Sequence, residues 1–105
     1  MYPDKVILFT TPIKRAQPFD GITPTNNFSQ NLNGYTLKQY SEIIKEVCSY
    51  YSIPCLDLWS ESGLNPALAA QQGYFDSTLT HPNSAGQEIM ARRVAGWIAS
   101  LIVNP

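Results

Sequence analysis

The only histidine of the chain, His81, is the first residue whose type and setting could do chemistry. Its imidazole titrates near neutral pH, the range that suits a general base. Pro82 follows it directly and restricts the backbone of both residues. Ser84 and Gln87 then have capping-box spacing, which predicts the start of a helix. We therefore expect His81 on a stiff loop just before a helix, although an ordinary surface histidine in a turn has the same local pattern.

The residues around this histidine resemble a known motif. His-Pro-Asn-Ser-Ala-Gly at positions 81–86 precedes an amphipathic helix near the end of the chain. This arrangement resembles the last motif block of the SGNH/GDSL hydrolases, Asp-x-x-His-Pro-Asn-x-x-Gly. In that family the histidine is the catalytic base of a serine esterase and the aspartate orients it. The resemblance is close over residues 76–86 and loose over the rest of the chain.

The acid departs from the family pattern. Thr78 stands three residues before His81, where the family has its aspartate, and the nearest carboxylate is Asp76, five residues before. A carboxylate stabilises an imidazolium well, whereas a neutral hydroxyl does so poorly. Both Asp76 and Thr78 are therefore candidate partners of His81. Asn83 and Gly86 of the motif are interpreted as structural.

No nucleophile is recognisable in the sequence. The resemblance implies a serine in a Gly-Asp-Ser motif and oxyanion donors that include a Gly-x-Asn block, and the chain contains neither. None of the serines close to His81 in sequence stands in a tight strand-to-helix turn; these are Ser60, Ser62, Ser77 and Ser84. A paired-carboxylate site at Asp57 and Glu61 is weaker still, because nothing fixes the separation of the two groups.

Two strands and two helices are expected to position these residues. Residues 5–11 and 53–59 are short β-rich apolar runs, and the first is typical of a strand buried on both faces. Apolar residues at helical spacing predict helices over residues 36–52 and 85–102. The order strand, helix, strand, helix predicts a right-handed βαβ unit and an α/β fold. In such sheets a ligand site lies beyond the carboxyl ends of the strands.

The connections carry weaker signals. Thr36 with Gln39 forms a capping box, and Tyr35 with Tyr40 has hydrophobic-staple spacing. Residues 12–34 form a connection that is unusually long for a compact domain, so we expect a functional loop or an excursion. The turn-rich stretch after the second strand has a possible helical turn at residues 67–72.

A two-stranded parallel sheet leaves unpaired edges and cannot stand alone. The resemblance implies the same shortage, since the SGNH fold is a longer three-layer α/β/α sandwich of flavodoxin-like type. We therefore expect residues 1–105 to be a single partial domain, the C-terminal βαβα part of such a sandwich. Either a missing N-terminal half or another chain would then lie against strand 5–11.

Composition excludes several functional classes. The net charge is −1 without a basic patch, which argues against nucleic acid. No apolar run is long enough for a membrane span and the N-terminus is no signal peptide, so the compartment stays undetermined. Cys48 and Cys55 are expected to be free thiols rather than a disulfide, and with one distant histidine they make no zinc site. No cofactor is implied.

The resemblance implies a serine esterase that hydrolyses acyl esters, foremost acetyl esters of carbohydrates. His81 would accept the proton of a serine supplied from outside this sequence. The alternative is a non-catalytic interaction or structural module that keeps part of the fold. A nucleotide-binding fragment is disfavoured, because no glycine-rich phosphate loop follows Thr11.

Overall fold

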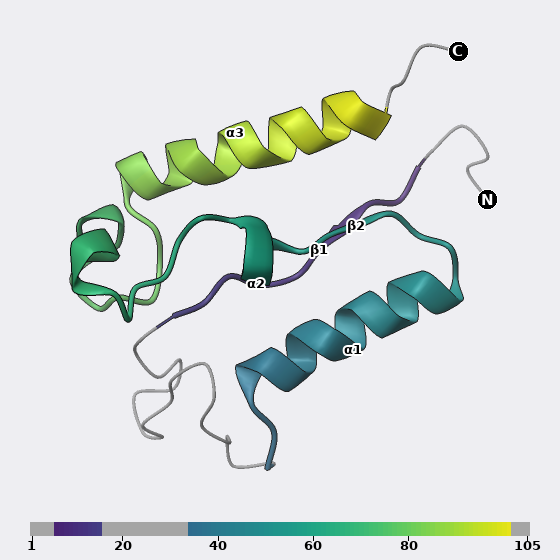
Figure 1. Ribbon diagram of the computed structural model, residues 1–105, viewed down its shortest axis with the longest axis horizontal. Coiled ribbons are helices and arrows are strands. Elements are labelled where there is room, and N and C mark those ends of the chain that lie inside the picture. Colours follow the sequence, from purple (N-terminus) through teal and green to yellow (C-terminus); the bar gives the residue numbers. More distant parts are fainter. Residues whose placement is uncertain (1–5, 16–33, 102–105) are drawn as a thin grey trace.

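The computed structural model describes residues 6–15 and 34–101. The elements are β1 (Phe9–Thr10), α1 (Leu37–Tyr50), β2 (Cys55–Leu56), α2 (Leu58–Glu61), the 3-10 helix η1 (Ala69–Tyr74) and α3 (Ser84–Leu101). The two strands pair in parallel, and α1 and α3 lie on opposite sides of the pair (Figure 1). The described residues therefore form an α/β unit with a two-stranded parallel sheet, as predicted.

The carboxyl ends of both strands point to one end of the molecule. Figure 1 shows that η1, the loop before α3 and the amino-terminal ends of α1 and α3 gather at this same end. Two of the loops expected to surround a site, the one after α2 and the one before α3, therefore do lie together. The predicted long connection falls mostly on residues 16–33, which lie outside the described part of the chain.

The first strand is shorter and more exposed than predicted. Pairing is limited to Phe9 and Thr10, flanked by hydrogen bonds from Phe9 N to the Pro54 oxygen (3.1 Å) and from Thr11 N to the Leu56 oxygen (3.0 Å). Its apolar run does not have two covered faces, since the side chains just before Phe9 are largely exposed: Val6 (78%) and Ile7 (63%). The reason is that, within residues 6–15 and 34–101, β2 is the only strand beside it.

The second strand ends earlier than predicted. Asp57 is the N-cap of α2, and its side chain accepts a hydrogen bond from Ser60 N at 3.2 Å. The predicted strand over residues 53–59 is therefore limited to Cys55–Leu56, and Asp57 does not stand in mid-strand. The local cap outweighs the β-propensity of this run.

The start of α1 follows the prediction closely. Thr36 Oγ1 accepts from Gln39 N at 3.1 Å, and Gln39 Oε1 accepts from Thr36 N at 2.8 Å, which completes the capping box. The rings of Tyr35 and Tyr40 meet edge to face with centroids 5.9 Å apart. After the helix the chain turns through Ser52, which has a positive φ of 56°.

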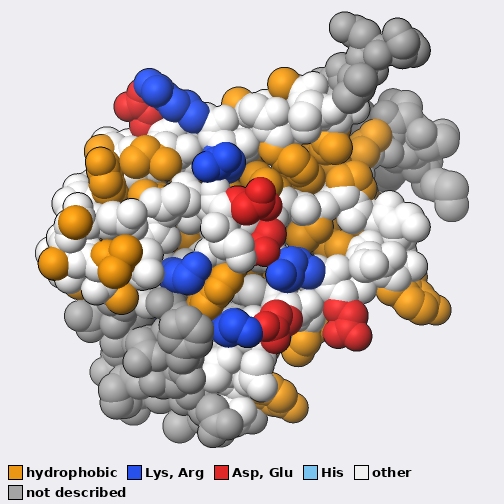
Figure 2. All heavy atoms as spheres, viewed as in Figure 1, with side chains coloured by type: hydrophobic (Ala, Val, Ile, Leu, Met, Phe, Trp, Pro, Cys, Tyr) orange, Lys and Arg blue, Asp and Glu red, His pale blue; other side chains and the backbone are white. Residues whose placement is uncertain are grey.

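The core is small and lies towards the carboxyl ends of the strands. Its buried apolar side chains are Cys48, Leu56, Leu58, Trp59, Leu64 and Phe75. Both cysteines are free, as predicted, with Cys48 buried and Cys55 half-buried. Figure 2 shows hydrophobic side chains exposed along the carboxyl-terminal half of α3. None of the described helices is long and apolar enough to cross a membrane.

Candidate functional site

The His81 loop is closed at its base by backbone contacts. Phe75 and Pro82 form an antiparallel bridge, and Asp76 N donates to the His81 oxygen at 2.8 Å. Inside the loop, Leu79 N donates to the Asp76 oxygen at 3.0 Å, and Leu79 adopts a positive φ of 56°. A leucine in this left-handed region is strained and persists only where its surroundings impose it. The loop is therefore tightly constrained.

The Asp76 carboxylate braces this loop from within. Its Oδ1 atom accepts from the Thr78 hydroxyl at 2.7 Å, from Thr78 N at 3.1 Å and from Thr80 N at 3.3 Å. A longer contact of 3.5 Å comes from His81 N. The Thr78 hydroxyl, followed by these backbone N–H groups, holds the pKa of Asp76 below its ordinary value. All four contacts use Oδ1, so Oδ2 is free of hydrogen bonds from the described residues.

The His81 side chain is exposed at this loop. Within residues 6–15 and 34–101, no hydrogen bond or ion pair joins its imidazole to Asp76 or Thr78. The structure thus brings the three predicted residues into one loop, where Asp76 and Thr78 bond to each other. The role of His81 as a base, and of either neighbour as its partner, stays a prediction.

Asn83 fixes the junction between the loop and α3. Its Oδ1 accepts from Gly86 N at 3.1 Å, the position of an N-cap bond. Its amide nitrogen donates to the Gly73 oxygen at 2.7 Å and to the Phe75 oxygen at 3.3 Å. The side chain thereby ties the helix start to the end of η1. The cap of α3 is therefore Asn83. The sequence pattern had predicted Ser84 as the cap, which is wrong.

Gly86 allows α3 to approach η1 closely. A Cβ at this position would lie 2.2 Å from the Tyr74 oxygen and 2.9 Å from the Pro82 Cβ. The predicted box of Ser84 with Gln87 is absent here; the Gln87 amide donates to the Pro82 oxygen at 3.3 Å instead. These contacts agree with the structural interpretation of the motif glycine.

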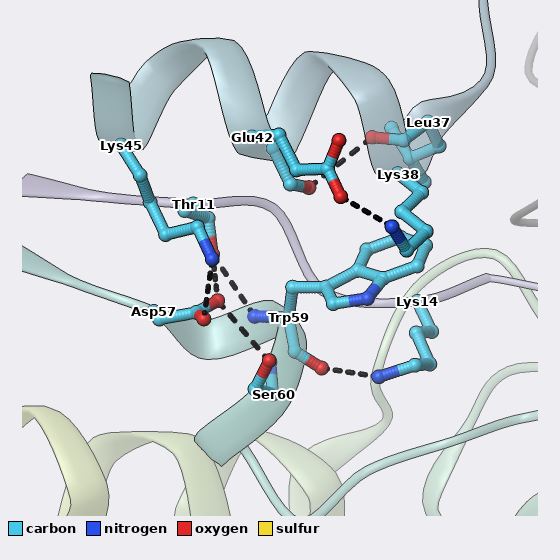
Figure 3. Close-up of polar contacts among 10 residues, drawn as sticks. Thr11, Lys14, Leu37, Lys38, Glu42, Lys45, Asp57, Trp59 and Ser60 are labelled. Carbon is cyan, nitrogen blue, oxygen red and sulfur yellow. Dashed lines mark hydrogen bonds and ion pairs between the residues drawn. The ribbon is translucent and has the colours of Figure 1, made fainter. Parts of the chain in front are cut away.

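A second polar cluster joins the carboxyl ends of the strands (Figure 3). Asp57 accepts from the Thr11 hydroxyl (3.1 Å) and pairs with Lys45 of α1 (3.1 Å). Trp59 N donates to the Thr11 hydroxyl oxygen at 2.9 Å. Burial raises the pKa of Asp57, but the bonds from Lys45, Ser60 and Thr11 outweigh it and hold the pKa below its ordinary value.

Sequence reasoning missed this cluster because Asp57 was assigned to a strand. The signal was present: Asp57 stands three residues before Ser60, the spacing of an N-cap and its partner. The carboxylate is fully engaged in the cluster, which argues against pairing it with Glu61 in a glycosidase site. In the described ranges, no three acidic, histidine or cysteine side chains lie close enough to hold a metal ion.

Comparisons with known proteins found similar solved structures, and these belong to longer chains. No protein-family model and no curated protein matches the sequence. A crystal structure with 30% identity superposes with a TM-score of 0.82, over 93% of this chain and 44% of the solved chain. The crystal structure of a protein from Lactobacillus plantarum, solved by a structural genomics consortium, has 24% identity and a TM-score of 0.76, over 97% and 48%. This chain spans less than half the length of either.

Proposed function

We propose that this chain is the histidine-bearing C-terminal part of an SGNH-type serine esterase that hydrolyses acyl esters. Acetyl esters of carbohydrates are the expected substrates, a choice that follows from the family resemblance. The observation that supports the proposal best is the braced loop. Asp76 and the bridge at its base hold His81, exposed, at the end of the molecule where the strands end.

In the complete enzyme the serine hydroxyl would attack the ester carbonyl. His81 would accept the hydroxyl proton and return it to the departing alcohol. Asp76 can assist without leaving the loop, because its brace uses Oδ1 and leaves Oδ2 free among the described contacts. A turn of the exposed imidazole towards Oδ2 would fix its tautomer and stabilise the developing positive charge.

The proposal includes a larger sheet, the three-layer α/β/α sandwich of the family. Two features support it: β1 has a single neighbouring strand among the described residues, and Val6 and Ile7 just before it are exposed. The solved structures that this chain resembles are more than twice as long as the part it matches. We place the remaining strands, with the serine and oxyanion donors, against β1, either from a preceding segment or from another chain.

One observation favours a second candidate, a non-catalytic module. In the described structure the Asp76 carboxylate is directed into the loop backbone, and the imidazole has no bond to it. A protein that kept only the architecture would keep the hydrogen bonds of Asp76 within the loop and those of Asn83 to η1 and α3. It would not need His81 as a base.

The test is an ester-hydrolysis assay with p-nitrophenyl acetate on two preparations. We expect the 105-residue chain alone to be inactive. The chain expressed with any coding sequence that precedes Met1 should be active, and His81→Ala should abolish that activity. Ser77→Ala, a change at an exposed position in the same loop, is the matched control and should leave it unchanged.

Asp76→Asn then tests the partner of His81. An asparagine keeps an acceptor at the Oδ1 position and replaces Oδ2 by an amide donor, which cannot accept from the imidazole. A loss of kcat on the order of 10⁴, as in other Ser-His-Asp hydrolases, is expected. Full activity in Asp76→Asn would refute the role of Asp76. Activity that survives His81→Ala would refute the role of His81 as the base. Absence of activity in the longer chain would refute the esterase and favour the non-catalytic module.

A further inference from the structure

A small hollow lies beside α2, separate from the His81 loop. Its volume is about 190 Å³, and the residues that matter for the argument are Lys14, Trp59, Leu64, Asn65, Leu68 and Gln71. Water occupies about 30 Å³ per molecule in the liquid, so this volume suits a molecule of a few non-hydrogen atoms.

The side-chain amide oxygens in the lining of the hollow already accept hydrogen bonds from the backbone. Gln71 Oε1 accepts from Asn65 N at 2.6 Å, and Asn65 Oδ1 accepts from Ala67 N at 3.1 Å. What remains of each side chain is its NH₂ group, a donor. Within the described part of the chain, neither NH₂ group has a hydrogen-bond partner.

Lys14 adds a cation to these donors. Its ammonium donates to the Trp59 carbonyl oxygen and lies 4.6 Å from the centroid of the indole ring (Figure 3). These contacts leave the ammonium with further N–H groups to donate. The nearby Asp57 carboxylate is paired with Lys45, so the positive charge of Lys14 is not fully cancelled. Burial lowers the pKa of Lys14, which shows that its charge is incompletely hydrated.

The apolar part of the lining comes from Trp59, Leu64 and Leu68. A ligand for this hollow needs an acceptor group for the donors and a short apolar part for these side chains. We propose that the hollow binds a short-chain carboxylate, with its oxygens on Lys14, Asn65 and Gln71 and its alkyl group against Trp59, Leu64 and Leu68.

This proposal goes beyond the esterase and does not rest on it, because binding can be measured without turnover. A short-chain carboxylate is also the acid released from an acyl ester, so a working site would place product near the carboxyl ends of the strands. Failure of binding would leave the esterase proposal unaffected.

The experiment is an NMR titration of the isotope-labelled protein, expressed with any coding sequence that precedes Met1, with sodium acetate and sodium butyrate at constant ionic strength. We expect saturable shifts of the Asn65 and Gln71 side-chain NH₂ signals, with butyrate tighter than acetate. Acetamide and sodium chloride should produce no saturable shift. Inorganic phosphate, which lacks an apolar part, should bind more weakly than butyrate.

Two variants locate the site. Lys14→Met removes the charge, and Gln71→Glu replaces the donor by a carboxylate oxygen while keeping the acceptor for Asn65 N. Each should weaken acetate binding by about tenfold or more, the effect of losing a charge-assisted bond. Lys38→Met, which removes an exposed lysine on α1, is the control and should bind like the wild type. Shifts that fail to saturate, equal shifts with chloride, tighter binding of phosphate, or wild-type binding in both variants would overturn the proposal.

Discussion

Gly86→Ala should weaken the fold at the junction that carries the His81 loop. The added methyl group would lie 2.2 Å from the Tyr74 oxygen and 2.9 Å from the Pro82 Cβ. The first is a backbone atom and the second belongs to a rigid ring, so neither can rotate away. The amino-terminal end of α3 would have to move off η1, and the bond from Asn83 N to the Tyr74 oxygen (2.9 Å) would lengthen or break.

The expected size follows from two opposing contributions. Overpacking a close contact costs about 1–3 kcal/mol, and the loss of one hydrogen bond adds about 1 kcal/mol. Replacing glycine by alanine inside a helix contributes up to about 1 kcal/mol in the other direction. The net loss in the free energy of unfolding should therefore be about 1–3 kcal/mol.

Gly96→Ala is the matched control, because it makes the same substitution in the same helix. A Cβ at Gly96 would have no neighbouring atom within 4 Å, so only the helix-propensity gain of about 1 kcal/mol remains. Urea denaturation followed by far-UV circular dichroism, at one protein concentration, measures both variants. We expect Gly96→Ala to raise the midpoint and Gly86→Ala to lower it. Midpoints that move together in the same direction would refute the close seating of α3 on η1.

Three further predictions concern other parts of the molecule. Asp57→Asn should reduce stability by about 1–2 kcal/mol at neutral pH. Because the folded pKa of Asp57 is lowered, the advantage of the wild type should be complete above the unfolded pKa of about 4 and should be lost below it, as the pH falls through the lowered folded pKa, in urea titrations at several pH values. Burial, with the bond to Cys48, raises the pKa of Cys55 to about 11, so iodoacetamide at pH 8 should alkylate Cys55 on the order of 100-fold more slowly than free glutathione, with the rate recovered in urea. The chain should self-associate through β1 in sedimentation velocity, and Ile7→Lys should reduce this; a wild-type monomer would contradict the open edge.

Capping residues three apart in sequence predicted the start of one helix correctly and the cap of another wrongly. Thr36 and Gln39 predicted the start of α1 because a capping box needs only the residues that form it. The cap of α3 was assigned to Ser84, whereas Asn83 caps the helix. The structural role expected of Asn83 is confirmed, but its bonds to Gly73 and Phe75 were not predictable, because they depend on how η1 folds back. The predicted length of β1 was wrong for a similar reason, because the pairing and burial of a strand depend on strands far away in sequence or in another chain.

In the candidate site, the place of a residue was predictable and its hydrogen-bond partners were not. Position and loop stiffness of His81 followed from Pro82 and the helix behind it. The direction of the Asp76 carboxylate did not, because four donors compete for it and three of them are backbone groups that face it only in the folded loop. Spacing in the sequence identified the carboxylate nearest to the histidine but not the atoms it would bind.

Polar groups and apolar surface are unevenly distributed over the molecule, and this bears on what completes the site. At the carboxyl ends of the strands, the carboxylates of Asp57 and Asp76 are engaged in hydrogen bonds, whereas the NH₂ groups of Asn65 and Gln71 have no partner among the described residues. Large apolar side chains are exposed on several elements: Val6 and Ile7 before β1, Tyr50 and Tyr51 at the end of α1, Leu68 and Tyr74 at η1, and Ile98 and Leu101 on α3. Apolar surface of this extent is typical of an interface. A completing polypeptide would therefore gain its binding energy from these faces, and it could add a nucleophile near His81 without rebuilding the loop.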